Sequence, residues 1–131
     1  MEYRTLGKSG LKVSLIGFGC FPIGGTVKYW PSAEEDAKKA IHRALDAGIN
    51  CFDTARVYGI SEEMLAEVIQ PKSGEVVIVT KCGLLRKPET SGHHRDSRPE
   101  AIRRSVEESL RRLKTDCLDV LLIHWPDENT P

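Results

Sequence analysis

The sequence has no net charge, because 19 Lys and Arg residues balance 19 Asp and Glu residues. Such a chain has no overall field that would attract nucleic acid or an anionic membrane surface. Its first residues lack the apolar core of a signal peptide, and no run approaches the roughly 20 apolar residues that cross a bilayer. We therefore expect a soluble, cytoplasmic protein that binds neither nucleic acid nor membrane.

Closely spaced cysteines are also lacking. The cysteines that the chain does contain are too widely spaced for the paired pattern of a metal site. We expect them to be reduced thiols that are mostly buried. Cys20 and Cys82 fall at expected strand ends, where a reactive thiol is the alternative. The four cysteines are Cys20, Cys51, Cys82 and Cys117.

Two ligand-binding patterns are missing. Gly17-Phe18-Gly19 with Gly24-Gly25 lacks the GxGxxG spacing and does not lead directly into a helix, so a Rossmann fingerprint is not expected. His93-His94 has no third ligand at a suitable spacing, and no metal site is predicted.

The 131 residues are expected to form a single domain, with a hairpin at 1–14 and the remaining elements at 15–131. Apolar runs and turn residues divide the chain into short strands and amphipathic helices. Residues 86–98 are expected to be a long polar loop. The expected strands are 2–5, 12–14, 15–19, 51–53, 76–80 and 119–123, and the expected helices begin near residues 32, 61 and 97.

Capping residues define the expected helices. Ser32 with Glu35 forms a capping box for the first helix, which Gly48 ends. Ser61 is expected to cap the second helix, and Pro71 to end it. In the third helix, an inward-facing stripe is predicted at Ile102, Val106, Leu110 and Leu113. The other face of that helix carries four charge pairs at i,i+4 spacing, 103–107, 104–108, 107–111 and 108–112, expected on a solvated surface.

A hairpin followed by alternating strands and helices predicts parallel strands joined by right-handed crossovers. An open doubly wound sheet and a closed barrel share this beginning. Both bind ligands at the carboxyl ends of the strands, where Gly19, Asp53, Lys81 and His124 fall.

Four of the residues near these ends suit carbonyl reduction. A carboxylate at Asp53 can orient the Lys81 ammonium, and an ammonium beside the Tyr58 phenol stabilises the phenolate left after proton transfer. His124 can direct a carbonyl oxygen by hydrogen bonding or tune the proton transfer. Each residue alone also has a structural explanation, such as capping a loop or filling a corner. Because three of the four strands end in an ionisable group, a functional site is favoured over separate structural roles.

The motifs resemble those of the aldo-keto reductases from Tyr3 to the last residues. The segments that carry the resemblance are Tyr3-Arg4-Thr5-Leu6-Gly7, Phe52-Asp53-Thr54-Ala55, Tyr58-Gly59, Ser61-Glu62, Thr80-Lys81, Ser109-Leu110-Arg111-Arg112-Leu113 and Leu122-Ile123-His124-Trp125-Pro126-Asp127. The resemblance implies an α/β fold, a (β/α)₈ TIM barrel capped by an N-terminal hairpin. It also implies reduction of aldehydes or ketones with NADPH, although the choice of NADP over NAD stays open.

The same resemblance implies roles for individual residues. The catalytic tetrad falls on Asp53, Tyr58, Lys81 and His124. Gly19 and Cys20, together with Asp53, lie along the cofactor, and Phe21, Trp30 and Trp125 are candidates for the substrate pocket.

The chain is shorter than the about 250 residues that eight strand-helix units need. We expect the hairpin with about four parallel strands and three helices, a half barrel without most of the family's nicotinamide, pyrophosphate and adenosine phosphate contacts. Two hypotheses follow. The chain is the N-terminal half of a reductase, inactive alone, or it is a non-enzymatic half barrel that associates with itself or with a complementary half through open sheet edges.

Overall fold

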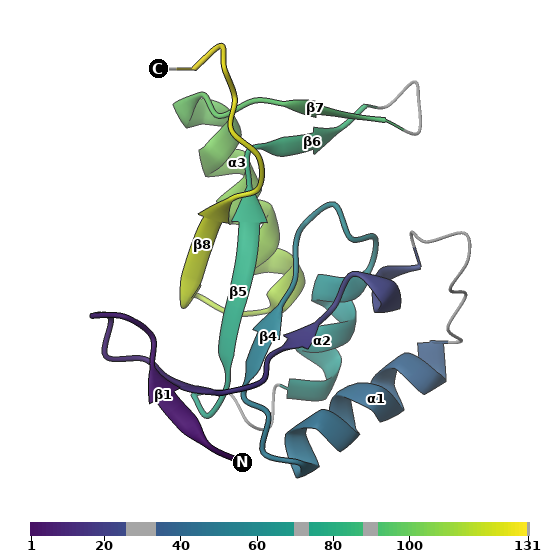
Figure 1. Ribbon diagram of the computed structural model, residues 1–131. Helices are drawn as coiled ribbons and strands as arrows, with labels where there is room; N and C mark the ends of the chain where they lie inside the picture. The colour runs from purple at the N-terminus through teal and green to yellow at the C-terminus, as the bar shows by residue number, and fades with distance from the viewer. Residues whose placement is uncertain (26–33, 70–73, 88–91, 131) are drawn as a thin grey trace.

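The computed structural model describes residues 1–25, 34–69, 74–87 and 92–130 (Figure 1). Ser32, Trp30 and Pro71, which carry three of the predictions above, lie outside these residues. In chain order the elements are β1 (Tyr3–Thr5), β2 (Lys12–Ser14), β3 (Phe18–Gly19), the 3-10 helix η1 (Pro22–Gly24), α1 (Glu34–Asp46), β4 (Cys51–Asp53), α2 (Ser61–Ile69), β5 (Val77–Cys82), β6 (Leu84–Arg86), β7 (His93–Arg95), α3 (Pro99–Leu113) and β8 (Val120–Ile123).

The first two strands form the expected hairpin. They pair antiparallel, with Tyr3 opposite Ser14 and Thr5 opposite Lys12. Gly7 and Gly10 have φ of +54° and +80°, a backbone region in which glycine lacks the steric penalty of other residues. The hairpin is joined to the rest of the chain through the Tyr3 hydroxyl, which donates to Gly48 O at 2.8 Å.

The central sheet has the strand order β3-β4-β5-β8, and every neighbouring pair is parallel. The predicted half barrel of four parallel strands and three helices is therefore confirmed. Gly19 lies opposite Asp53, and Asp53 lies opposite Val79. In Figure 1, α2 and α3 lie behind the sheet, α1 lies beside it at the lower right, and the near face carries no helix.

The core lies between the sheet and the first two helices. Phe52, Ile41 and Leu65 are completely buried there. Ala37 and Ala44 of α1 are buried as well. Gly48, with φ of +83°, ends this helix as expected, because its amide donates to Leu45 O in the final turn.

The buried face of α3 differs from the predicted one. Ile102, Val106 and Leu110 are only half-buried, and Leu113 alone of the predicted stripe is fully covered. The buried positions of the helix are instead small residues, Ala101, Ser105 and Ser109, and α3 packs against both α2 and β5. Small side chains let a helix backbone approach its neighbours closely.

The predicted charge pairs along α3 are not formed among the described residues. Arg112 instead forms ion pairs with Glu62 and Glu63 of α2, and Glu108 pairs with Arg56 in the loop after β4. These charges thus join different elements, because α2 packs directly against α3.

The polar segment 86–98 is not simply a loop. Residues 84–86 and 93–95 pair antiparallel as β6 and β7, with Leu85 opposite His94. This second hairpin projects beyond the carboxyl ends of the parallel strands (Figure 1). The prediction was wrong because the segment lacks the hydrophobic alternation by which strands are found; His93, His94 and Arg95 are all exposed.

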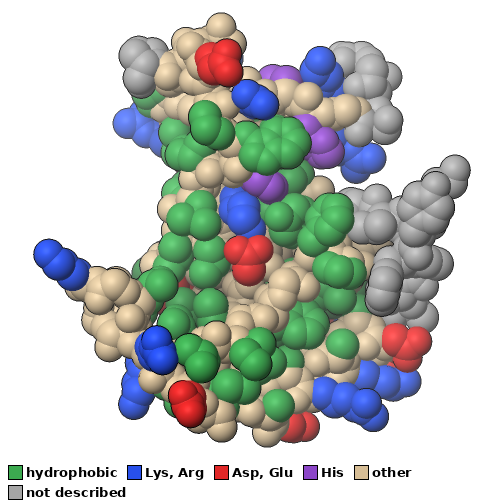
Figure 2. All heavy atoms as spheres, viewed as in Figure 1, with side chains coloured by type: hydrophobic (Ala, Val, Ile, Leu, Met, Phe, Trp, Pro, Cys, Tyr) green, Lys and Arg blue, Asp and Glu red, His purple; other side chains and the backbone are tan. Residues whose placement is uncertain are grey.

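The face of the sheet without helices is apolar. Figure 2 shows hydrophobic side chains gathered over it, around acidic, basic and histidine side chains near the centre of the view. Leu121, Leu122 and Ile123 of β8 are exposed, as are Leu15 and Ile16 before β3. The outer strand β8 and the segment that leads into the other outer strand, β3, therefore carry unburied apolar groups. No helix within the described segments combines the length and apolarity that a membrane span needs.

Candidate active site

An ion pair joins the ends of two neighbouring strands. Lys81 on β5 donates through Nζ to Asp53 Oδ1 at the end of β4, at 2.7 Å, and to Thr54 O at 2.8 Å. The Lys81 side chain is only 12% exposed, whereas that of Asp53 is 46% exposed. The lysine is thus held from two sides, and the carboxylate keeps an accessible surface.

Tyr58 lies in the loop between β4 and α2, beside this ion pair. Lys81 Nζ is 5.1 Å from the centroid of its ring, and Phe21 contacts the ring edge-to-face at a centroid distance of 5.0 Å. A cation this close to an aromatic ring is attracted to it and stabilises a negative charge on the phenol. The predicted neighbourhood of Tyr58 and Lys81 is therefore present.

His124 closes the cluster from the end of β8. Its ring lies 5.5 Å from that of Tyr58, at an interplanar angle of 84°. Its amide donates to Cys82 O, which fixes the residue to the end of β5. Burial, and then the nearby Lys81 charge, lower the pKa of the imidazole below its ordinary value. The imidazole is consequently neutral near pH 7 and able both to donate and to accept a hydrogen bond.

The backbone around Tyr58 is fixed by η1. Gly24 O accepts a hydrogen bond from the Ile60 amide at 3.2 Å, and the Tyr58 amide donates to Ala55 O at 2.9 Å. A Cβ atom on Gly24 would lie 1.6 Å from Tyr58 O, so only glycine allows the two segments to approach this closely. The position of the phenol thus depends on a glycine 34 residues earlier in the chain.

The other predicted site residues differ in their exposure to solvent. Gly19 lies at the exposed end of β3, and a Cβ atom added there would meet nothing within 4 Å, so the space beside it is open. Cys20 is completely buried; its amide donates to Asp53 O and its carbonyl accepts from the Ile23 amide. Phe21 and Trp125 are both exposed near the cluster, and Trp125 lies against His124 at a centroid distance of 5.9 Å.

The cysteines do not provide a reactive thiolate at the cluster. Burial and the negative charge of Asp53 raise the pKa of Cys20, and burial raises that of Cys82. All four cysteines are free. Across segments 1–25, 34–69, 74–87 and 92–130, no group of three or more His, Cys, Asp or Glu side chains could hold a metal ion.

The second hairpin contributes a residue that the sequence did not suggest. The Arg95 guanidinium lies 5.6 Å from the centroid of the Trp125 ring and donates to Pro126 O at 3.2 Å. It lies beside Trp125 at the exposed end of the cluster. Without the β6–β7 pairing, a single arginine in a polar segment gives no signal that could have identified it.

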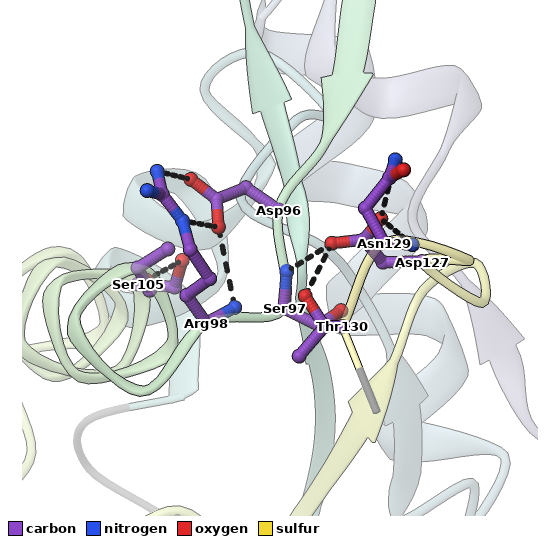
Figure 3. Close-up of polar contacts among 8 residues, drawn as sticks. Asp96, Ser97, Arg98, Ser105, Asp127, Asn129 and Thr130 are labelled. Atoms are coloured by element: carbon purple, nitrogen blue, oxygen red, sulfur yellow. Dashed lines mark hydrogen bonds and ion pairs between the residues drawn. The ribbon is translucent and has the colours of Figure 1, made fainter.

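Asp127 fixes the segment that follows His124 and Trp125. Figure 3 shows its carboxylate between the start of α3 and the last turn of the chain. Its oxygens accept from the Ser97 amide at 3.0 Å, the Asn129 amide at 3.1 Å and the Thr130 hydroxyl at 2.7 Å. These bonds lower the pKa of Asp127, that of the Ser97 amide most strongly.

Asp96 makes a similar contribution beside it (Figure 3). Its carboxylate accepts from the Arg98 side chain through both oxygens, at 2.9 and 2.7 Å. This pair holds the pKa of Asp96 at about 2. Because the Asp96 amide donates to Gly83 O, the start of α3 is connected to the end of β5.

A buried polar layer under the site was not predicted from the sequence. Glu62, Ser61, Thr54 and Thr80 are all completely buried. The Thr80 hydroxyl donates to Glu62 Oε1 at 2.8 Å, and the hydroxyls of Thr54 and Ser61 lie 2.8 Å apart. The sequence predicts that Ser61 caps α2, but its hydroxyl lies against that of Thr54, the residue that follows β4, instead.

Comparison with known proteins gives one consistent result. A sequence model described as "Aldo/keto reductase family" matches residues 15–131. L-galactose dehydrogenase of Arabidopsis thaliana is 40% identical over 129 residues, which cover 95% of this chain and 38% of that protein.

Solved structures agree. An aldo-keto reductase of Bacillus halodurans in its holo form has a TM-score of 0.88 at 32% identity, over 100% of this chain and 42% of that one. An aldo-keto reductase of Klebsiella pneumoniae in complex with NADPH has a TM-score of 0.72 at 29% identity, over 98% of this chain and 41% of that one. The chain therefore spans about two fifths of the length of these relatives.

Proposed function

The chain belongs to the aldo/keto reductase family of oxidoreductases, and from this premise we propose that it carries the catalytic tetrad of an enzyme that reduces aldehydes or ketones to alcohols with NADPH. We further propose that it is one domain, residues 1–131, with the hairpin 1–14 as a cap and residues 15–131 as half of the barrel. The activity belongs to a full-length context in which the rest of the barrel is present.

The observation that supports this proposal best is the cluster of Asp53, Tyr58, Lys81 and His124. In reduction, the carbonyl oxygen gains a proton while the carbonyl carbon gains a hydride. Tyr58 is the proton donor, because the Lys81 cation beside its ring stabilises the phenolate that remains. Asp53 keeps Lys81 in place through the 2.7 Å bond.

His124 is proposed to orient the substrate. A neutral imidazole can donate a hydrogen bond to the carbonyl oxygen, and its lowered pKa keeps it neutral near pH 7. Its ring, together with those of Phe21 and Trp125, gives the exposed end of the cluster an aromatic wall. Trp30 is the remaining candidate for the substrate pocket.

One end of a nicotinamide cofactor fits the residues present. The space beside Gly19 is open, and the exposed Asp53 carboxylate can accept hydrogen bonds from hydroxyl groups. Gly19 and Asp53 would hold this end, with Cys20 buried directly behind Gly19 in the chain, and the bound cofactor would supply the hydride. Lys81 is engaged with Asp53 and Thr54, so it is not available as a phosphate ligand. We propose that the rest of the barrel supplies most of the phosphate contacts. The NADPH complex of the Klebsiella pneumoniae relative favours NADPH as the cofactor.

The alternative function is a non-enzymatic half barrel that associates with itself or with a complementary half. The exposed apolar residues of β8 and of the segment before β3 favour association. This alternative is compatible with the presence of the tetrad, which would then remain only by descent.

Turnover separates the two functions. The purified 131-residue chain and a protein that contains it in a complete barrel are each mixed with NADPH and a panel of small aldehydes, and NADPH absorbance is followed. We expect activity only in the complete barrel, and loss of that activity in Tyr58→Phe. A complete barrel that is inactive on every carbonyl, or equally active with Phe at position 58, would contradict the proposal.

A further inference from the structure

The first turn of α2 holds a buried carboxylate to which the proposed reaction gives no role. Glu62 is 0% exposed, and so is its neighbour Ser61. Glutamate is almost never fully buried unless it is paired, because an ionised group loses its hydration when it leaves water. A specific arrangement around Glu62 is therefore expected.

Both residues bond to strands that carry the site. Glu62 Oε1 accepts from the hydroxyl of Thr80, the residue before Lys81. The Ser61 hydroxyl lies 2.8 Å from that of Thr54, the residue after Asp53. One helical turn thus holds two neighbouring strand ends at the positions next to the ion pair.

The contact with Thr54 acts directly on Lys81. Thr54 O is the second acceptor of the Lys81 ammonium, at 2.8 Å. A shift of Thr54 would therefore move an acceptor, while a shift of Thr80 would move the backbone that carries the donor.

The second carboxylate oxygen of Glu62, Oε2, is poorly bonded. A contribution to stability alone therefore does not explain why a carboxylate occupies this buried position. Within the described part of the chain, Oε2 accepts no hydrogen bond, and Arg112 Nη1 lies 3.7 Å away. A buried, incompletely bonded ion pair is often no more stable than apolar residues of similar size. The role that remains for Glu62 and Ser61 is to hold Thr80 and Thr54 in place.

We propose that Glu62 and Ser61 are positioning residues, which hold Thr80 and Thr54 so that the Lys81 ammonium keeps both of its bonds, to Asp53 Oδ1 and Thr54 O. The consequence for catalysis rests on the proposed function. The positioning itself is a property of the 131-residue chain and can be measured without turnover.

The experiment follows Lys81 Nζ by NMR in chain labelled with ¹⁵N-lysine, with the signal assigned by its absence in Lys81→Met. A buried ammonium with two acceptors exchanges its protons slowly and gives a signal of its own, unlike the exposed lysines. Glu62→Ala and Thr80→Val are each expected to abolish this signal. Glu62→Gln is expected to retain it, because the amide oxygen still accepts from Thr80.

Glu63→Ala is the matched control. Glu63 lies in the same turn and pairs with Arg112, as Glu62 does, but neither bond of the Lys81 ammonium involves it. It should leave the Lys81 signal unchanged. Thr80→Val keeps the volume of the side chain, so the test remains valid if Glu62→Ala fails to fold.

Three results would overturn the proposal: no distinct Lys81 signal in the unchanged chain, a retained signal in Thr80→Val, or a signal lost in Glu62→Gln as in Glu62→Ala. Loss of the Lys81 signal in Glu62→Gln would mean that the signal depends on the charge of Glu62 and not on its hydrogen bond with Thr80. Because none of these readings needs NADPH, failure of the proposed reductase activity is recognised separately, by the turnover of Tyr58→Phe.

Discussion

Gly24 and Tyr58 touch backbone to backbone: a Cβ on Gly24 would lie 1.6 Å from Tyr58 O and 2.6 Å from Tyr58 C. No side chain rotation can relieve an overlap between a Cβ atom and a carbonyl group. The loop that carries the phenol can therefore keep its position only if residue 24 has no side chain.

Gly24→Ala is expected to destabilise the chain by about 2 kcal/mol, the middle of the range for overpacking. Urea unfolding followed by circular dichroism measures the loss. Gly19→Ala is the control, because its Cβ would meet no atom within 4 Å. Equal stability of the two variants would contradict the close approach of η1 and the Tyr58 loop.

Tyr58→Phe is expected to lower kcat in a complete barrel by about 10²–10⁴, the contribution of a general acid. Only the hydroxyl is removed, so the ring contacts with Phe21 and His124 remain and the fold should be unchanged. Steady-state kinetics with NADPH and an aldehyde give the value. Tyr3→Phe is a matched control, because that hydroxyl donates to Gly48 O in the distant hairpin. A similar fall in both variants would exclude a specific role for Tyr58.

Lys81→Met is expected to raise the pKa of His124. The Lys81 charge is the second cause, after burial, that lowers this pKa, and Met removes the charge. NMR titration of the imidazole measures the change, with Lys12→Met as the control in the first hairpin. If the pKa of His124 is the same in Lys81→Met, the Lys81 charge is too far from the imidazole to affect it.

The same shift gives a pH dependence of stability. With its folded pKa below the ordinary value of about 6.5, His124 binds a proton more readily in the unfolded chain. Its contribution to stability is therefore present above about pH 6.5 and is lost as the pH falls through the folded pKa. The free energy of unfolding, measured with urea across this pH range, should depend less on pH in Lys81→Met than in the wild-type chain.

Asp127→Ala is expected to release the segment after β8 from α3. Its carboxylate accepts from the Ser97 amide, and hydrogen exchange at that amide should become faster. The pKa of Asp127 is lowered in the folded chain, so its contribution is present above the unfolded value of about 3.9 and is lost as the pH falls through the folded pKa. Acid should thus reproduce the effect of the substitution. Asp116→Ala changes an exposed carboxylate and should leave Ser97 protected.

Leu122→Lys is expected to reduce self-association of the 131-residue chain. Leu122 lies on β8, the outer strand of the sheet, and is exposed together with Leu121 and Ile123. A charge on an edge strand opposes pairing with a second copy. Sedimentation velocity over a range of concentrations gives the oligomeric state. Ile60→Lys changes an equally exposed residue away from the edge and should have little effect; an unchanged chain that is monomeric throughout would contradict association through the sheet.

Much of the fold and part of the site were predictable because they depend on local sequence. The strand Cys51–Asp53 and the start of α2 at Ser61 were predicted at the observed positions. Asp53, Lys81 and His124 were expected together because parallel strands end at one edge, and the structure brings them together with Tyr58. The second hairpin was missed, since its exposed strand has no apolar alternation.

The sequence by itself determined the order of strands and helices and the chemical types at the strand ends, because periodicity and turn residues act over a few neighbours. Only the tertiary structure decided which groups are buried. Glu62 and Cys20 are completely buried, and in α3 the serines at 105 and 109 are buried whereas Val106 is only half-buried. The physical reason is that burial depends on what distant segments place against a residue, as Thr80 does for Glu62 across 18 positions.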